Sequence, residues 1–320
     1  MIRVQGLILV QRATATCGWF HLRSELMRKL FSTLAMCATL MAAGGCAPSV
    51  LERSRVGNVA WVSQDKIYFL REVGSEDSEL WLRDAGRDRK LASDVDVPDH
   101  CGSFDFLFAV KPQVLGLGMK CDGFERLVSY SETTGVFAAL LDVPSAVDVT
   151  WSDDGRNGYL SVGKDGCWEI QPLGEPAGSQ LADWGSWSCR SGKSAKSPSV
   201  AADGSIIFLA TNEPQPDQLD GYERRVWRLM TISEGKGALG QIGPELHGLP
   251  DLALVPGGTK AIVTVSFNGP GEVFEIDLRS GDSRRLYEAE GAALSPSVSP
   301  DGKEVAFVGG GRRLIVQKLP

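Results

Sequence analysis

Four cysteines in the body of the chain have the clearest chemistry of any residues in the sequence: Cys101, Cys121, Cys167 and Cys189. None of them belongs to a C-x-x-C pair, the spacing typical of a zinc site, so zinc is the weaker interpretation. An even number of thiols in an oxidising compartment predicts two disulfides, and three pairings are open on sequence grounds. Pairing neighbours, Cys101 with Cys121 and Cys167 with Cys189, would close two loops of about 20 residues each.

An oxidising compartment is predicted by residues 27–46, MRKLFSTLAMCATLMAAGGC. Arg28 and Lys29 supply positive charge, and residues 30–43 form an apolar run of 14 residues. Such a run is too short to cross a bilayer as a stable helix and is typical of an export signal. The small residues at positions 43–45 lead directly to the thiol of Cys46.

The end of this segment resembles the lipobox of bacterial lipoproteins, in which small residues stand beside the cysteine that receives diacylglycerol. The resemblance implies that residues 27–45 are a signal peptide and that Cys46 is lipidated, although Ala43 stands where the lipobox usually has Leu. A plain secretory signal with an incidental cysteine is the alternative. We interpret residues 1–26 as an extension upstream of the true start at Met27; the alternative is a long, genuine leader.

The charge balance limits the partners. Removing residues 1–45 leaves 28 basic and 39 acidic residues, a net charge of −11. Such a surface repels polyanions, so we expect no nucleic-acid binding. It also repels anionic lipid headgroups, so the N-terminal lipid is the expected membrane contact. About 275 residues suffice for one large all-β domain or two ordinary domains.

A search for catalytic residues is mostly negative. After Cys46 the chain has two histidines, His100 beside Cys101 and His247 in a Gly/Pro-rich stretch, and they suggest no Ser–His–Asp set. No G-x-S-x-G, H-E-x-x-H or phosphate-binding glycine motif occurs. The acidic run Asp94, Asp96 and Asp99 is interpreted as a solvated turn in preference to a calcium site. We therefore expect no catalytic residues, metal or cofactor.

A repeated unit runs through the rest of the chain. Its clearest copy is residues 299–307, SPDGKEVAF, in which a strand ends, Asp301-Gly302 makes a tight turn and an apolar strand follows. Further copies, some degenerate, begin near Ser63, Val110, Trp151, Ala202 and Val255. A period of about 40–55 residues with several short strands per unit predicts a β-propeller.

Each unit also contains a third strand with an aromatic or large apolar residue. These strands are residues 79–82, 126–130, 167–170, 226–229, 272–276 and 313–316. Their tryptophans could be mistaken for a carbohydrate platform, but we interpret most of them as packing between blades.

These turns and strands resemble the TolB-like propeller family, which repeats a Ser-Pro-Asp-Gly turn and an apolar strand. The resemblance covers roughly residues 57–320 and implies an all-β, six-bladed propeller of four-stranded antiparallel blades. TolB itself carries an α/β domain before its propeller, whereas about ten residues separate Cys46 from the first blade here. The resemblance therefore implies the fold and not the Tol–Pal role.

The last unit has room for three strands only. We expect the segment from Ser49 to Arg55 to supply the fourth, so that an N-terminal strand closes the ring and removes an unpaired edge. On this interpretation residues 46–56 are the lipidated tether and closing strand, and residues 57–320 are the propeller.

Blade geometry also predicts a functional face. The start of the first strand, the connection from second to third, and the end of the fourth all lie at one end of a blade. This places the four cysteines at one end and favours the two local disulfides. A long insertion at residues 212–224 lies there too, and Trp184, Trp187 and Tyr222 are the candidate binding anchors. A neutral insertion, with tryptophans that cover a blade edge, is the alternative.

The sequence therefore indicates an extracytoplasmic, monomeric lipoprotein anchored to a bacterial membrane. Its expected role is a non-catalytic scaffold for an envelope protein, peptide or glycan. A propeller enzyme of the metal-dependent lactonase or sugar lyase type, with its site in the central channel, is the alternative.

Overall fold

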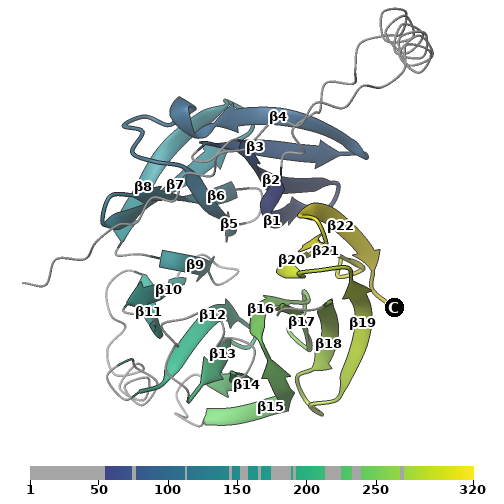
Figure 1. Cartoon of the computed structure of the whole chain (residues 1–320). Helices are drawn as coiled ribbons and strands as arrows, with labels where there is room; N and C mark the ends of the chain where they lie inside the picture. Colours follow the sequence, from purple (N-terminus) through teal and green to yellow (C-terminus); the bar gives the residue numbers. More distant parts are fainter. Residues whose placement is uncertain are drawn as a thin grey trace, which may run out of the picture. The chain divides into compact units, whose positions relative to one another are not determined.

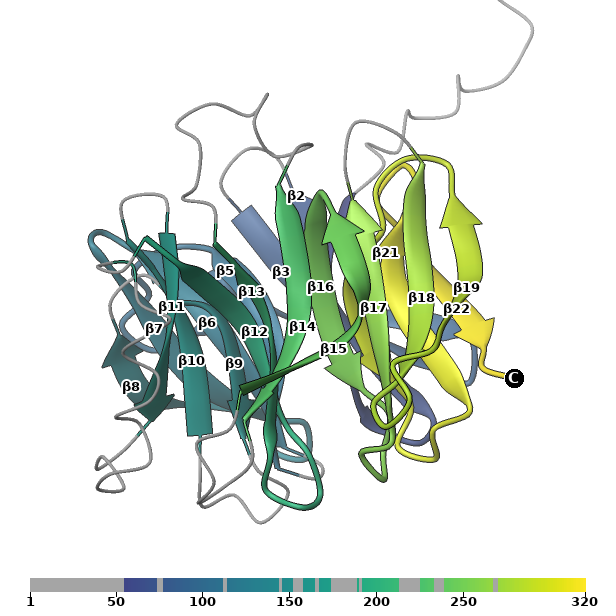
Figure 2. The ribbon, with the colours of Figure 1, turned by 90° about the horizontal axis from the view of Figure 1, so that it is seen from below.

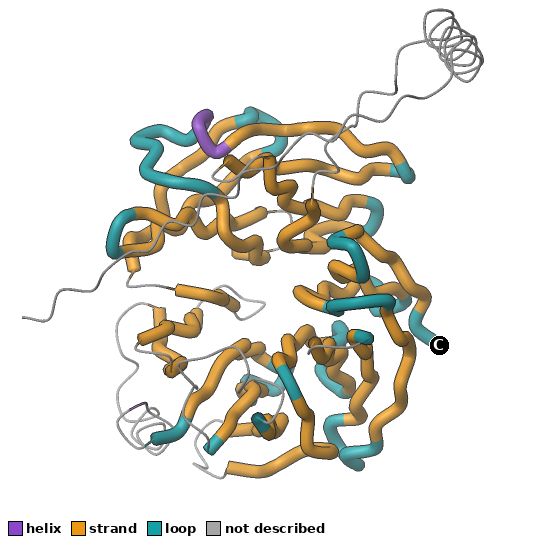
Figure 3. The backbone as a smooth tube through the Cα atoms, in the orientation of Figure 1, coloured by secondary structure: helices purple, strands orange, loops and turns teal. Residues whose placement is uncertain are grey.

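The computed structural model describes residues 55–73, 77–111, 114–143, 146–151, 158–164, 167–173, 189, 192–212, 225–232, 239–266 and 270–320. The chain divides into two units, Met1–Arg53 and Ser54–Pro320, and every described residue belongs to the second. Within these ranges the structure consists of strands, the loops between them and short 3-10 segments such as η1 (Asp94–Asp96), with no α-helix (Figure 3).

Six antiparallel sheets are arranged around a common axis, which confirms the predicted six-bladed propeller (Figure 1). The sheets follow one another in sequence, and within each sheet the strands run outward in chain order. Blade 1 contains β1 (Arg55–Ser63), β2 (Lys66–Val73), β3 (Asp77–Asp84) and β4 (Arg87–Ser93). Blade 2 contains β5 (Phe104–Lys111), β6 (Val114–Cys121), β7 (Phe124–Ser131) and β8 (Val136–Val143).

Blade 3 contains β9 (Ala146–Trp151), β10 (Gly158–Lys164) and β11 (Cys167–Leu173). Blade 4 contains β12 (Ser194–Val200), β13 (Ile206–Thr211), β14 (Val226–Ile232) and β15 (Leu239–His247). Blade 5 contains β16 (Leu249–Leu254), β17 (Lys260–Ser266), β18 (Gly271–Asp277) and β19 (Ser283–Ala289), and blade 6 contains β20 (Leu294–Val298), β21 (Glu304–Gly309) and β22 (Arg313–Lys318). Blades 3 and 6 thus have three strands each among the described residues.

The repeated turn joins the first and second strands of a blade, as predicted. Between β20 and β21, Gly302 has a φ of 72°, and the Asp301 carboxylate accepts a hydrogen bond from the Lys303 N–H over 3.1 Å. Between β12 and β13, Gly204 has a φ of 79°, and Asp203 accepts from the Ser205 N–H over 2.9 Å. Glycine adopts this positive φ without a steric penalty, which is why Asp-Gly recurs at this point.

Six apolar clusters hold the ring together, and each lies between two neighbouring sheets. Phe69 and Ala306, for example, belong to the cluster between blades 1 and 6. Trp227 is fully buried between blades 4 and 5, and its ring centroid lies 5.9 Å from that of Trp168. The described tryptophans of the third strands therefore pack between blades, as the sequence predicted.

The first and last blades meet directly among the described residues. The Val56 N–H donates to the Arg312 carbonyl over 2.9 Å, and the Trp61 N–H donates to Oγ of Ser297 over 2.8 Å. The predicted closing strand, from Ser49 to Arg55, lies outside the described residues except for Arg55, which begins β1. A fourth strand in blade 6 therefore stays a prediction.

Candidate functional site

Polar side chains from the innermost strands surround a cavity on the propeller axis. Asn58, Asp148, Lys196, Asp251 and Ser295 line this cavity, and they come from β1, β9, β12, β16 and β20. Its volume is about 210 Å³. Since the first strand of each blade lies nearest the axis (Figure 1), these five residues form what we call the polar belt.

Hydrogen bonds run around the belt from one blade to the next. The Leu107 N–H donates to Oδ1 of Asn58 over 3.1 Å, and Nδ2 of Asn58 donates to Oγ of Ser295 over 3.2 Å. The Ser295 N–H donates to Oδ2 of Asp251 over 3.2 Å, and Nζ of Lys196 lies 3.5 Å from Oδ1 of that carboxylate.

A final contact brings blade 3 into the belt, because Asp148 accepts a hydrogen bond from Ser197. The belt therefore connects the first strands of all six blades.

Bulges in the first strands orient the belt residues. The pairing register shifts between Lys196 and Ser199 in β12 and between Leu294 and Ser297 in β20. Ser197 and Ser295 have φ values of 51° and 49°, in the left-handed region that non-glycine residues rarely adopt. A bulge places two residues opposite one and so redirects the side chains that follow.

The ammonium group of Lys196 is held by both charge and aromatic rings. Its Nζ lies 5.4 Å from the Trp168 ring centroid and 5.2 Å from that of Trp227, and the residue is buried. Cation–π contacts of this kind stabilise a partly desolvated cation. The ammonium group of Lys196 is therefore held beside the carboxylate of Asp251.

The environment of Asp148 favours its neutral form. Burial, together with the negative charge of Asp251, raises the pKa of Asp148 to about 7, although Lys196 and Ser197 act in the opposite direction. Asp148 is half-buried and lines the cavity. The belt thus contains a carboxyl group that titrates near neutral pH.

A second carboxyl group with a raised pKa lies at the start of β7. Glu125 is buried, and its Oε2 has no hydrogen-bond partner among the described residues. Burial raises the pKa of Glu125 to about 7, and the charge of Asp105 contributes to the increase. Burial also raises the pKa of Asp105, so this pair favours protonated carboxyl groups.

Two disulfides lie at the same end of the blades as the polar belt, where they join segments that connect neighbouring strands. They join Cys101 to Cys121 and Cys167 to Cys189, with Cα–Cα distances of 5.1 and 5.7 Å. Both predicted local pairs are therefore confirmed. Disulfides are typical of proteins outside the cytoplasm, and the pairs agree with an extracytoplasmic location.

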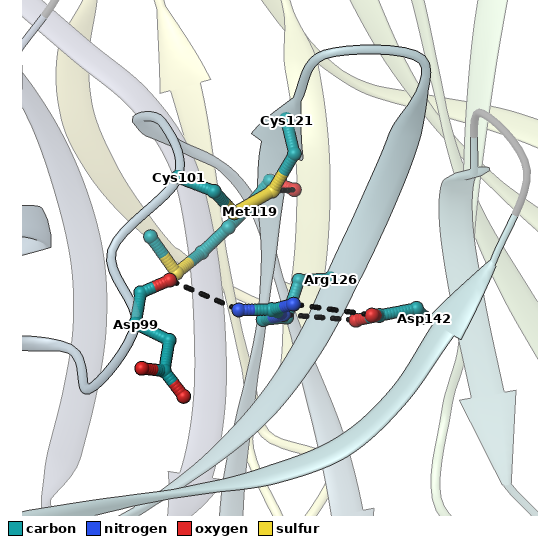
Figure 4. Close-up of a disulfide and its surroundings, with 6 residues drawn as sticks. All are labelled: Asp99, Cys101, Met119, Cys121, Arg126 and Asp142. Carbon is teal, nitrogen blue, oxygen red and sulfur yellow. Dashed lines mark hydrogen bonds and ion pairs between the residues drawn. A yellow bond between two sulfur atoms is a disulfide. The ribbon is translucent and has the colours of Figure 1, made fainter.

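Arg126 lies near the first disulfide and bonds to two segments beside it (Figure 4). Its Nη1 donates to the Asp99 carbonyl over 2.9 Å, and its Nε donates to Oδ1 of Asp142 over 2.9 Å. Because Asp99 precedes Cys101 and Asp142 lies on β8, these bonds connect the segment that carries the disulfide to the outer strand of blade 2.

The acidic run before Cys101 has a structural role. Asp96 and Asp99 are exposed, as expected of a solvated turn, but the same prediction is wrong for Asp94, which is 2% exposed. Oδ2 of Asp94 accepts hydrogen bonds from the Ser78 N–H and hydroxyl over 2.8 and 3.1 Å. Within the described part of the chain, no group of three or more His, Cys, Asp or Glu side chains is placed to hold a metal ion.

The structure describes only some of the other residues that the sequence singled out. Cys46, Trp184, Trp187 and Tyr222 lie outside the described residues, so their roles stay predictions. His100 is exposed, and His247, in the Gly/Pro-rich stretch, is the exposed last residue of β15.

Sequence reasoning missed the polar belt. A signal for it exists: residues 197–204, SPSVAADG, and residues 295–302, SPSVSPDG, share six of eight positions. The Asp-Gly end of this longer repeat identifies the turn. Its Ser-Pro-Ser beginning marks the bulge that carries the belt.

Known proteins resemble this chain in structure and not in sequence. No family model and no curated protein sequence matches it. A TolB from Agrobacterium tumefaciens superposes with a TM-score of 0.55 at 15% identity, over 83% of this chain and 91% of that one. TolB from Acinetobacter baumannii gives 0.52 at 12% identity, over 77% and 57% of the two chains.

The tricorn protease gives a TM-score of 0.51 at 11% identity, over 83% of this chain and 33% of that one. The chain thus spans little more than half of the Acinetobacter protein and a third of the protease. The similarity establishes the fold: a TolB-like six-bladed β-propeller. The set includes a protease as well as TolB proteins, so the similarity shows the fold and identifies neither a role nor a partner. No helix among the described residues is long and apolar enough to cross a membrane.

Proposed function

We propose that this chain is an extracytoplasmic lipoprotein whose propeller is a non-catalytic binding scaffold at the bacterial envelope. The partner, a protein, peptide or glycan, binds at the end of the channel where the polar belt and the disulfides lie. One observation carries the proposal: a polar cavity opens on the axis at the same end of the blades as the disulfide-tied connections. Rigid connections around a concave polar centre are typical of binding sites.

The anchor in this proposal is the lipid on Cys46. Eight residues, 47–54, separate that cysteine from β1 and span at most about 28 Å when extended. With so few residues between the lipid and β1, the anchor would hold the propeller close to the membrane. Metabolic labelling with a palmitate analogue should mark the wild-type protein and not Cys46→Ser. An unlabelled wild type in the soluble fraction would refute the anchor.

The partner site can be tested with the soluble propeller as bait on detergent-solubilised membranes. We expect a captured partner to be lost with Asp251→Asn, which weakens the charge pair with Lys196. The double variant Trp187→Ala, Tyr222→Ala tests the anchors predicted from the sequence. Lys318→Ala, at the exposed last residue of β22, is the matched control. If both site variants capture the partner as well as the wild type does, the partner binds elsewhere on the propeller.

Enzymatic activity in the channel is the second candidate. A carboxyl group with a pKa of about 7, Asp148, beside Lys196 and Asp251 has the properties of a general base. Incubation with lactones and with uronate oligosaccharides, together with metal analysis of the purified protein, tests it. Turnover that Asp148→Asn abolishes would establish the enzyme, and turnover that the variant retains would exclude Asp148 as its base.

A further inference from the structure

A second cavity lies between blades 1 and 2, at the opposite end of the strands from the polar belt. Its volume is about 540 Å³, within the range of about 300–1,000 Å³ that is usual for ligand pockets. The turn from β1 to β2 and the turn from β7 to β8 form its rim. We call it the rim pocket.

A carboxylate with three donors forms the polar side of the rim pocket. Glu132 accepts hydrogen bonds from Nζ of Lys66, the Tyr68 hydroxyl and Nη2 of Arg89, each over 2.7 Å. Although burial acts against it, the bonds from Lys66 and Tyr68 lower the pKa of Glu132, so the carboxylate is ionised at neutral pH. An ammonium group has three donors, and Lys66 retains N–H groups that can face a ligand.

Further hydroxyl groups line the same pocket as this carboxylate. The side chains of Ser63, Ser131, Thr133 and Thr134 line the pocket, and none of their hydroxyls bonds to a residue that the structure describes. Each hydroxyl can donate one hydrogen bond and accept two. The pocket therefore offers several neutral polar groups in a small space.

The remaining wall is apolar and partly open to solvent. Val62, Val114, Val136 and Ala138 form it, and Val136 on β8 is 56% exposed. An apolar wall opposite hydroxyls and a carboxylate suits a ligand that has both an apolar face and a dense edge of hydroxyl groups. A purely aliphatic ligand would leave the polar groups without partners, which is costly.

We infer that the rim pocket binds a saccharide, with a sugar ring lying against Val136 and Ala138 while its hydroxyls bond to Glu132, Lys66 and the threonines. Carboxylates and hydroxyl side chains bond readily to the neighbouring hydroxyls of a sugar. The site goes beyond the proposed function, because it lies at the far end of the blades from the channel mouth and does not involve the belt.

The test uses the soluble propeller and hexasaccharides of glucose, mannose, galactose and N-acetylglucosamine, followed by calorimetry. At least one should bind with a Kd of about 1 mM or lower. Ala138→Trp, which fills the pocket, should weaken binding at least about tenfold, and Thr133→Val with Thr134→Val should weaken it less. Failure of all four sugars to bind, or full binding by Ala138→Trp, would overturn the inference.

The matched control is Ala139→Trp. Ala139 is the next residue on β8 and lines a different hollow, so the control should bind sugar like the wild type. The channel variant Asp251→Asn should also retain sugar binding. A sugar whose binding depends on Asp251 and not on Ala138 would belong to the channel, and would contradict the rim pocket while supporting the proposed function.

Discussion

Nδ2 of Asn58 donates a hydrogen bond to Oγ of Ser295 over 3.2 Å, although 237 residues separate the two. The same side chain accepts from the Leu107 N–H, so one amide connects blades 6, 1 and 2. Asn58 is therefore one of the points at which the first and last blades are joined, and it lines the cavity on the axis.

Replacing Asn58 with alanine removes both bonds and leaves the Leu107 N–H without its partner. We expect a loss of about 1–3 kcal/mol in the free energy of unfolding, which is a fall of roughly 2–8 °C in Tm for a domain of this size. Urea titration and calorimetry measure the effect, with the exposed Lys318→Ala as control. A variant as stable as the wild type would show that the bond contributes nothing to closure.

Removing residues 50–54 tests the predicted closing strand. If these residues add a fourth strand to blade 6, their loss exposes the outer edge of β22 and should lower the Tm markedly. The deletion leaves β1 intact, because that strand begins at Arg55. An unchanged melting curve would mean that the contacts of Asn58, Val56 and Trp61 with blade 6 close the ring on their own.

Stability should fall as pH rises from about 5 to 8. Asp148 and Glu125 have pKa values of about 7 in the folded protein, against 3.8 and 4.5 when exposed. The folded state therefore binds protons that the unfolded state has released in this window, and deprotonation above it favours unfolding. The lowered pKa values of Asp203 and Asp277 act below this window and in the opposite direction.

Glu125→Gln isolates one of these groups. Because an amide does not titrate, the variant should lose part of the pH dependence of the urea midpoint. Asp148→Asn should remove another part. A Glu125→Gln variant with the full wild-type slope would rule out Glu125 as a contributor.

Each disulfide should stabilise the ring by constraining the unfolded chain. The Cys101–Cys121 pair has a sequence separation of 20 residues, worth about 3 kcal/mol in the chain-entropy model. Cys101→Ala with Cys121→Ala should therefore lower the free energy of unfolding by about this amount under oxidising conditions. Under reducing conditions the variant and the wild type should converge, and a persistent difference would point to packing instead.

The outer strand of blade 2 is unusually apolar. On β8, Val136, Leu140 and Leu141 are 56, 42 and 47% exposed, whereas β4 and β19 carry several arginines. An exposed apolar edge promotes association between chains, and charges prevent it. Leu140→Lys with Leu141→Lys should raise the concentration at which the heated protein scatters light. Val95→Lys, which changes an exposed apolar residue of η1 that is not on a strand edge, is the control and should change little.

Local features of the sequence were sufficient to predict the architecture of the propeller. A turn such as Asp301-Gly302 depends on the positive φ of one glycine and on the nearest carboxylate, both encoded within a few residues. The apolar strands on either side of each turn specify a sheet, and their period specifies a ring. The positions of the four cysteines relative to these strands then favoured the correct disulfide pairs.

A repeated Ser-Pro-Ser marks two of the bulges that carry the polar belt, but no local pattern encodes the contacts between its side chains. Ser197 and Ser295 lie in bulges with positive φ, so the simple alternation of a strand does not indicate which neighbours face the axis. Lys196, Asp148 and Asp251 lie on three different blades, and their charges interact only because the ring closes. The sequence by itself determined the blades and their number, since these follow from short-range turns and strands. Only the tertiary structure decided which side chains meet on the axis and in the rim pocket, because those meetings require sheets distant in sequence to pack side by side.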